Sequence, residues 1–100
     1  MMQSITAIEL KNKLDKGENI YLIDVREHFE HQEFNIGGML IPLSSIFENV
    51  SLINKESQVI IYCQKGIRSQ IAIQRLQQKF GFENLINLQG GMDAWKKSIK

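Results

Sequence analysis

The only cysteine of the chain, Cys63, lies where an apolar run ends and a helical pattern begins. The loop after it contains two cations, Lys65 and Arg68, and a glycine, Gly66, that allows the backbone to turn sharply. A helix that begins at about Ser69 would direct free backbone N–H groups toward this loop, and such groups bind anions. These surroundings favour the thiolate over the thiol, and the thiolate is the nucleophile. The segment therefore predicts a reactive cysteine in a site that attracts anions.

Cys63 also has a simpler interpretation, because free cysteines are among the most buried residues and most of them are inert. Lys65 and Arg68, taken singly, fit two solvated surface charges. Their joint placement with Gly66 directly after one cysteine is less easily assigned to chance. We therefore favour a reactive thiol over a buried strand end.

The rest of the chain alternates short apolar runs with helical patterns. Strands are expected at 19–26, 58–63 and 83–91, with a brief extended piece at 39–43; helices are expected at 4–17, 69–81 and 92–100, with a short helix or turn at 27–34 and another short helix at 44–53. This alternation favours βαβ units and a doubly wound α/β fold, in which a parallel sheet is covered by helices on both faces. Sites in such folds lie at the carboxyl ends of the strands, and Cys63 is at such an end.

Length, charge and composition limit the function further. One hundred residues suffice for a single domain, expected over 1–100, but not for two cores. The formal net charge of +1 gives no electrostatic reason to expect a nucleic-acid partner. No run has the apolar core of a signal peptide or the length of a membrane span, so no membrane partner is expected. A cytoplasmic location with a reduced thiol is the resulting expectation.

Four polar residues at or just after the end of the apolar run 19–26 need an explanation. Asp24 and Arg26 fall on one face of the expected strand, and lone charges are seldom buried. We expect the two to lie close together, and such an ion pair needs no catalytic role to be present. His28 and His31 could share a helical face, but two histidines are too few ligands for a closed zinc site. A solvated polar face explains them better, and no metal is expected.

Three blocks of the sequence, taken in order, resemble single-domain rhodanese-like sulfurtransferases. Block 22–43 is similar to the family's Asp-Val-Arg strand and following loop, block 60–72 to its active-site strand, loop and helix, and block 85–95 to its closing Gly-Gly and Trp segment. The resemblance covers nearly the whole chain and implies a rhodanese-like α/β fold with a five-stranded, mostly parallel sheet flanked by helices on both faces. One departure is Asn35, which stands where many relatives have a histidine.

The resemblance also implies a reaction. Thiolate Cys63 would take the outer sulfur of thiosulfate or a similar small anionic donor, and the resulting persulfide would pass it to a thiophilic acceptor. The acceptor would be cyanide in vitro, and a small thiol or a thioredoxin-like or sulfur-carrier protein in vivo. The implied substrate-binding residues are Gln64, Lys65, Gly66, Ile67 and Arg68, supported by Asp24, Arg26 and Ser69. No cofactor is implied.

Two other functions compete with sulfur transfer. Cysteine phosphatases and arsenate reductases use a cysteine and an arginine in a related loop. The phosphatases that resemble this fold have five residues between the two, whereas four separate Cys63 from Arg68 here. The shorter loop favours a pocket for a sulfur atom over one for a phosphate group. A non-catalytic rhodanese-like binding module is the second alternative, but such modules typically lack the cysteine.

Overall fold

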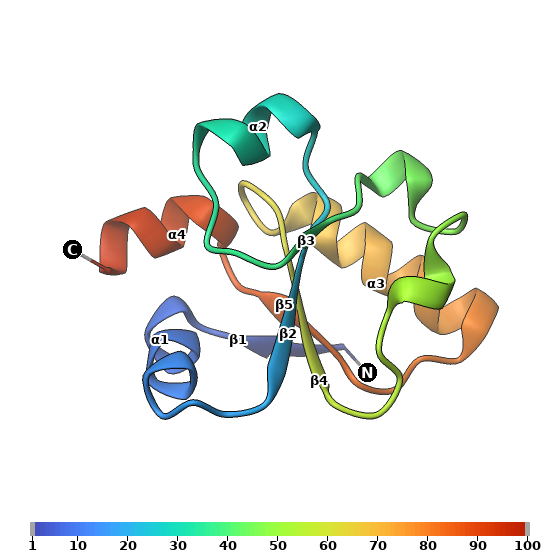
Figure 1. Ribbon diagram of the computed structural model, residues 1–100, viewed down its shortest axis with the longest axis horizontal. Coiled ribbons are helices and arrows are strands. Elements are labelled where there is room, and N and C mark those ends of the chain that lie inside the picture. Colours follow the sequence, from blue (N-terminus) through green and yellow to red (C-terminus); the bar gives the residue numbers. More distant parts are fainter. Residues whose placement is uncertain (1, 100) are drawn as a thin grey trace.

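The computed structural model describes residues 2–99, which contain five strands and four α-helices (Figure 1). The strands are β1 (Gln3–Ile5), β2 (Ile20–Asp24), β3 (Met39–Leu40), β4 (Gln58–Tyr62) and β5 (Leu85–Leu88). The helices are α1 (Ala7–Asp15), α2 (His28–Glu33), α3 (Ile67–Phe80) and α4 (Gly91–Ser98), with 3₁₀ turns at Leu43–Ser45 and Val50–Leu52. Within this part of the chain, no helix combines the length and the apolar character that a membrane span requires.

All five strands belong to one sheet with the order β1-β5-β4-β2-β3, and every neighbouring pair is parallel. Parallel neighbours need crossover connections, which the helices and turns provide. This sheet confirms the expected α/β fold. The central strand β4 pairs with β2 in a register that aligns Tyr62 with Asp24. The carboxyl ends of β2 and β4 therefore lie side by side, and the residues after them share one edge of the sheet.

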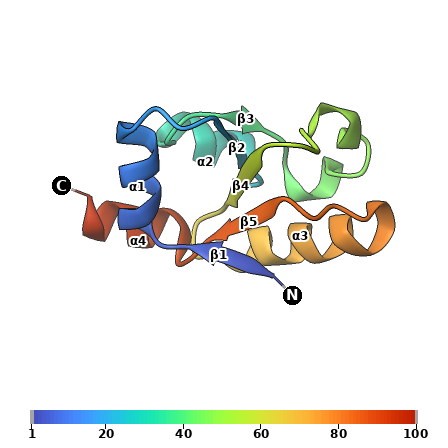
Figure 2. The ribbon, with the colours of Figure 1, turned by 90° about the horizontal axis from the view of Figure 1, so that it is seen from below.

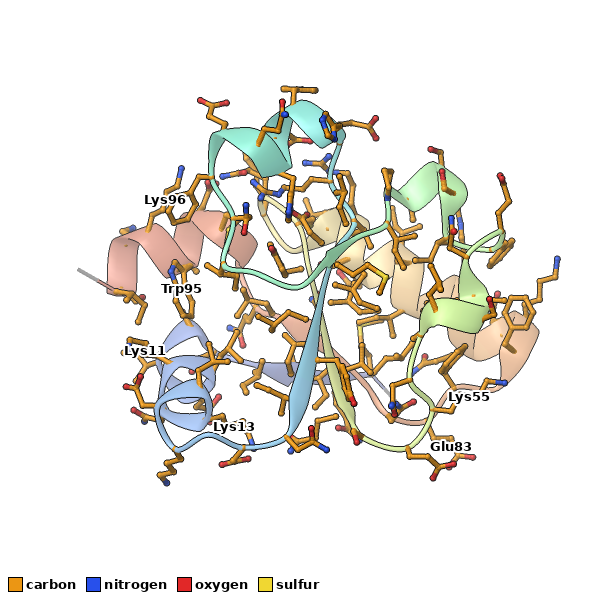
Figure 3. The ribbon with its side chains drawn as sticks, in the orientation of Figure 1. Lys11, Lys13, Lys55, Glu83, Trp95 and Lys96 are labelled. Atoms are coloured by element: carbon orange, nitrogen blue, oxygen red, sulfur yellow. The ribbon has the colours of Figure 1, made fainter. Side chains whose placement is uncertain are left out.

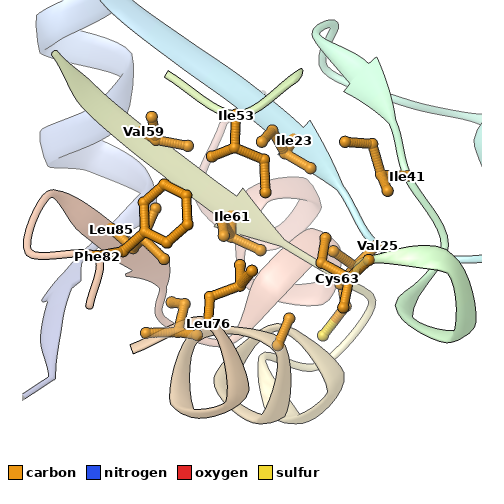
Figure 4. Packing of buried hydrophobic residues seen from close by; sticks show 13 residues of the cluster. Ile23, Val25, Ile41, Ile53, Val59, Ile61, Cys63, Leu76, Phe82 and Leu85 are labelled. Carbon is orange, nitrogen blue, oxygen red and sulfur yellow. The ribbon is translucent and has the colours of Figure 1, made fainter. Parts of the chain in front are cut away.

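Each face of the sheet has its own apolar core, because side chains alternate along the central strands. Val59, Ile61 and Cys63 point to the face that is covered by α3 and the 3₁₀ turns (Figure 4). Ile60 and Tyr62 point to the opposite face, which α1 and α4 cover. Figure 1 shows the sheet nearly edge-on between these two layers, and Figure 2 shows the same separation from below. Helix α2 belongs to neither layer and lies beyond the carboxyl ends of β2 and β4 (Figure 1).

The first and last helices are each fixed by local interactions. Thr6 caps α1 through a capping box, in which Thr6 and Glu9 exchange side-chain and backbone hydrogen bonds. Met92 of α4 is fully buried, and Trp95 packs partly buried against the same core (Figure 3). The amino end of α4 is thereby fixed on the sheet next to the loop after β4.

The short helix predicted over 44–53 appears as two 3₁₀ helices, at Leu43–Ser45 and Val50–Leu52, and not as one continuous α-helix. Its backbone hydrogen bonds join residues three apart, such as Ile46 to Leu43 and Ile53 to Val50. Asn49 donates its side-chain amide to the carbonyl of Ser45, which an α-helix would need for its own bonds. The β-branched residues and serines of this stretch also have low helix propensity.

The start of α3 and the presence of β1 also differ from the expectation. Helix α3 begins at Ile67 and not at about Ser69, because Gly66 adopts a left-handed conformation (φ 88°) and serves as its N-cap. Strand β1 was not expected at all, since its three residues are too few to show a pattern. The shift in α3 matters for the site, because it places Ser69 inside the first turn with its N–H directed at the cysteine.

Candidate active site

Cys63 is the first residue after β4, and its sulfur is directed toward the start of α3 (Figure 4). Its Sγ accepts a hydrogen bond from the backbone N–H of Gly66 at 3.1 Å and another from that of Ser69 at 3.3 Å. Both N–H groups therefore point at the sulfur, where they can hold negative charge that forms on it during a reaction. The predicted convergence of loop, glycine and helix start on the cysteine is therefore present in the structure.

Ser69 and Asn87 form a buried polar pair beside the sulfur. Ser69 Oγ lies 3.3 Å from Cys63 Sγ and donates to Asn87 Oδ1 at 2.5 Å. The Asn87 amide nitrogen donates to the carbonyl of Gly66 at 3.3 Å, which fixes the orientation of its side chain. Asn87 belongs to β5, so this pair fastens the loop and the first turn of α3 to the neighbouring strand.

The backbone of the loop is held from the other side by α4. The N–H of Met92 donates to the carbonyl of Cys63 at 2.9 Å, and that of Asp93 donates to the carbonyl of Gln64 at 3.0 Å. The Gln64 amide also donates to Asp93 Oδ1 at 2.7 Å. A side chain at Gly91 would collide with this backbone, since a Cβ there would lie 2.3 Å from the Cys63 carbonyl oxygen. Glycine is thus required where α4 meets the loop.

Asp24 and Arg26 form the pair predicted from their spacing. The guanidinium donates to both Asp24 carboxylate oxygens at 2.8–3.1 Å, and the two side chains are 0% and 2% exposed. Arg26 also donates to the Gln64 side-chain oxygen at 3.0 Å and to the Phe34 carbonyl at 2.6 Å. The pair therefore connects the loop after β2 with the loop after β4, as a supporting structure does.

The buried Tyr62 lies beside the Asp24–Arg26 pair. Its ring lies 5.7 Å from the Arg26 guanidinium carbon, and its hydroxyl donates to the Gly37 carbonyl at 2.9 Å. Burial, together with the nearby Asp24 carboxylate, raises the pKa of Tyr62 to about 12. Tyr62 is accordingly a neutral hydrogen-bond donor throughout the physiological pH range.

The two cations of the loop have different surroundings. Lys65 is exposed, whereas the Arg68 guanidinium makes a bidentate pair with Glu30 of α2 at 2.8 and 2.9 Å. The hydrogen bond from Arg68, outweighing the effect of burial, lowers the pKa of Glu30 to about 2. Nothing in the sequence pattern indicates this partner, because Glu30 and Arg68 are 38 residues apart.

A pocket of about 240 Å³ opens over the cysteine. It is lined by Cys63, Gln64, Lys65, Ile67 and Arg68. Cys63 itself is only 1% exposed, so the sulfur lies at the bottom of a space that admits small molecules. Pockets for drug-sized ligands are typically about 300–1,000 Å³. A larger hollow of about 530 Å³ lies beside β2 and β3. Among the described residues that line it, there is no cysteine, histidine, lysine or arginine.

The two histidines fall into different environments. His28 is exposed, but His31 Nδ1 lies 2.8 Å from Asp24 Oδ2, so a fully solvated face describes only the first of them. Within the described residues, no three metal-ligating side chains are grouped together. Asn35 accepts a hydrogen bond from Gly37 N–H at 2.8 Å and donates to the His31 carbonyl, and it shapes the turn before β3.

The structure thus places Gly66 and Ser69 against the Cys63 sulfur, and Gln64, Lys65, Ile67 and Arg68 around the pocket above it. Asp24 and Arg26 support the loop from the side of β2. Three participants were missed: Glu30, Asn87 and Asp93. Asn87 had a detectable signal, because a polar residue inside the apolar run of β5 requires a buried partner. Glu30 and Asp93 had none, since each meets the loop only through the tertiary fold.

Comparisons with known proteins show which family the chain resembles. The model of the Rhodanese-like domain matches residues 6–98. The probable adenylyltransferase/sulfurtransferase MoeZ of Mycobacterium tuberculosis is 37% identical over 100 residues, which cover 97% of this chain and 25% of MoeZ. The thiosulfate sulfurtransferase GlpE of Coxiella burnetii is 33% identical over 85 residues, which cover 84% of this chain and 78% of GlpE. This chain therefore spans only about a quarter of the length of MoeZ, but most of that of GlpE.

A solved structure shows the same fold. The crystal structure of a rhodanese-like domain protein from Staphylococcus aureus superposes with a TM-score of 0.85 at 36% identity, covering 94% of this chain and 91% of that one. The match of the family model, the identity to sulfurtransferases and the shared fold agree with one another. The chain belongs to the rhodanese-like domain family.

Proposed function

We propose that the protein transfers sulfane sulfur through a persulfide on Cys63. In the first step the thiolate attacks the outer sulfur of thiosulfate, a Cys63 S–S bond forms, and the S–S bond of the donor breaks to release sulfite with the bonding electrons. In the second step a nucleophile such as cyanide attacks the outer sulfur of the persulfide. Thiocyanate leaves, and the thiolate returns.

The observation that carries this proposal is the placement of Cys63 Sγ against two backbone N–H groups at the bottom of a small pocket. Donors in this position stabilise the attacking thiolate and require no reorganisation during the reaction. The N–H groups that face the sulfur are also suited to hold the negative charge of the persulfide. The exposed cation Lys65 at the same pocket attracts an anionic donor.

Phosphate-ester hydrolysis is the less favoured alternative. A phosphate group has three oxygens that need donors, whereas the loop allows only four residues between Cys63 and Arg68. The guanidinium of Arg68 is also engaged by Glu30 and does not face the sulfur freely. We therefore expect no phosphatase activity. The retained cysteine, in turn, argues against a purely non-catalytic binding module.

The acceptor we propose is a thiol, either small or on a protein such as a sulfur carrier or a thioredoxin-like reductant. Two exposed apolar side chains suit contact with a protein surface: Ile67 lines the pocket over Cys63, and Phe29 lines a second hollow that shares Gln64 with it. A cytoplasmic location would supply such thiols in reduced form. The relatives named as sulfurtransferases support sulfur transfer as the class of reaction.

The test is the rate of thiocyanate formation from thiosulfate and cyanide, measured for the wild type and for Cys63→Ser. We expect turnover by the wild type and none by the variant. An aryl phosphate is offered to both proteins in parallel. Aryl phosphate hydrolysis that depends on Cys63, without thiocyanate formation, would replace this proposal with the phosphatase alternative.

A further inference from the structure

Glu30 holds Arg68 in a fixed position at the edge of the active-site pocket. The carboxylate receives two hydrogen bonds from the guanidinium, at 2.8 and 2.9 Å. Its Oε1 also accepts the backbone N–H of Glu27 at 3.0 Å, within the capping box of α2. The Glu30 side chain is only 18% exposed, so the helix and the arginine together restrict its movement.

The Glu30–Arg68 ion pair changes the net charge that a sulfur donor meets at the pocket over Cys63. Arg68 lines the pocket over Cys63, but the adjacent Glu30 carboxylate balances its positive charge. The attacking thiolate adds a further negative charge. Among the residues that line the pocket, the exposed Lys65 then supplies the positive charge that balances the thiolate. A donor with two negative charges is repelled by Glu30 twice as strongly as a donor with one, because Coulomb energy is proportional to charge.

We propose that Glu30 is a positioning residue that sets the charge preference of the site, by holding Arg68 and by disfavouring dianionic sulfur donors relative to monoanionic ones. The inference rests on the proposed sulfur transfer and extends it to the class of donor. Monoanionic sulfane compounds, such as thiosulfonates and persulfides of uncharged thiols, are then better matched to the pocket than thiosulfate. With a thiosulfonate the thiolate takes the outer sulfur, and the donor leaves as a sulfinate with the electrons of the broken S–S bond.

Two donors of nearly equal shape separate charge from size. Thiosulfate is a dianion, and methanethiosulfonate is the monoanion in which a methyl group replaces one oxygen. The variant Glu30→Gln removes the negative charge and keeps an oxygen that can accept from Arg68. Because this pair is partly exposed, its loss is expected to leave the protein folded, which a thermal melting curve verifies. Glu33→Gln removes an exposed carboxylate from the same helix and serves as the matched control.

The measured quantity is kcat/KM for each donor with saturating cyanide. In Glu30→Gln we expect kcat/KM for thiosulfate to rise roughly three- to tenfold at low salt, and that for methanethiosulfonate to rise by about the square root of that factor. The excess gain for thiosulfate should shrink as salt is added, because salt screens the charge. Glu33→Gln should change the ratio of the two values less.

The possible results distinguish a failure of the proposed sulfur transfer from a failure of the proposed role of Glu30. If the wild type uses neither donor, the proposed function fails. If the wild type uses a donor, but Glu30→Gln leaves the ratio of the two kcat/KM values unchanged or shifts it toward methanethiosulfonate, sulfur transfer stands and the role of Glu30 is overturned. An equal change for both donors that does not respond to salt would also overturn it, because that pattern indicates a purely structural effect.

Discussion

The contact between Gly91 and the active-site loop allows a quantitative test of how the site is held. In Gly91→Ala the new Cβ would lie 2.3 Å from the carbonyl oxygen of Cys63 and 2.7 Å from the carbonyl carbon and oxygen of Gln64. These are backbone atoms, so they cannot swing away as the end of a flexible side chain would. The φ angle of +57° at Gly91 adds strain for any residue with a Cβ.

The expected cost follows from these two effects. A left-handed conformation costs a residue with a Cβ about 1–2 kcal/mol. Displacement of the loop also weakens the two hydrogen bonds that Met92 and Asp93 donate to it, each of which contributes about 0.5–1.5 kcal/mol. We therefore expect Gly91→Ala to lower the free energy of unfolding by about 2–5 kcal/mol.

Gly81→Ala is the matched control for this variant. Gly81 has a similar φ of +70°, but a Cβ there would meet no atom within 4 Å, so only the conformational cost of about 1–2 kcal/mol applies. Urea unfolding gives the free energies, and the rate of Cys63 alkylation by iodoacetamide reports on the loop. We expect the control to keep the wild-type alkylation rate and Gly91→Ala to change it. Equal free-energy losses and equal alkylation rates in the two variants would refute the claim that α4 positions the loop.

Three further outcomes test other parts of the site. Asp24→Asn should lower the free energy of unfolding by about 3–5 kcal/mol, because it leaves the buried Arg26 charge uncompensated; a loss of sulfur transfer at full stability would instead indicate direct catalysis. Ser69→Ala should cost about 1–3 kcal/mol in urea unfolding, because Asn87 Oδ1 then loses its donor, and a neutral result would contradict the role of this pair. Glu30 has its folded pKa lowered to about 2 from 4.5, so its contribution to stability is complete above pH 4.5 and is lost as the pH falls toward 2. Urea midpoints measured between these pH values should therefore fall less steeply in Glu30→Gln than in the wild type, and identical slopes would show that the ion pair contributes nothing.

Much of the fold could be predicted because its signals are local. The apolar runs at β2, β4 and β5 have the length and composition of buried strands, and the capping box at Thr6 marks the start of α1. The segment 44–53 could not be predicted in the same way. Its apolar residues fit a helix, but the competing side-chain hydrogen bond of Asn49 and the burial of Ile46 and Ile53 favour tighter turns.

In the site, too, the residues brought together by local structure could be predicted, and those brought in by the tertiary fold could not. Residues 63–69 are contiguous, so the approach of the Gly66 and Ser69 N–H groups to the Cys63 sulfur follows from a strand, a turn at a glycine and a helix. Asp24 and Arg26 are two residues apart, and strand geometry alone brings them together. Glu30 and Asp93 reach the loop only because α2 and α4 are packed beside it. Their contribution depends on the arrangement of whole elements, which no spacing in the sequence encodes.

The central claim is that Cys63 carries the transferred sulfur, and the intact mass of the protein tests it most directly. The intact mass of the reduced protein is measured before and after treatment with excess thiosulfate, and again after treatment with cyanide. The variant Cys63→Ala is treated in the same way. The account predicts that the wild type gains the mass of one sulfur atom, that cyanide removes it, and that the variant gains nothing. A wild-type protein that stays unmodified while its thiol is free and reactive to alkylation would contradict sulfur transfer from this donor, and a gain of sulfur by Cys63→Ala would contradict the role of the cysteine.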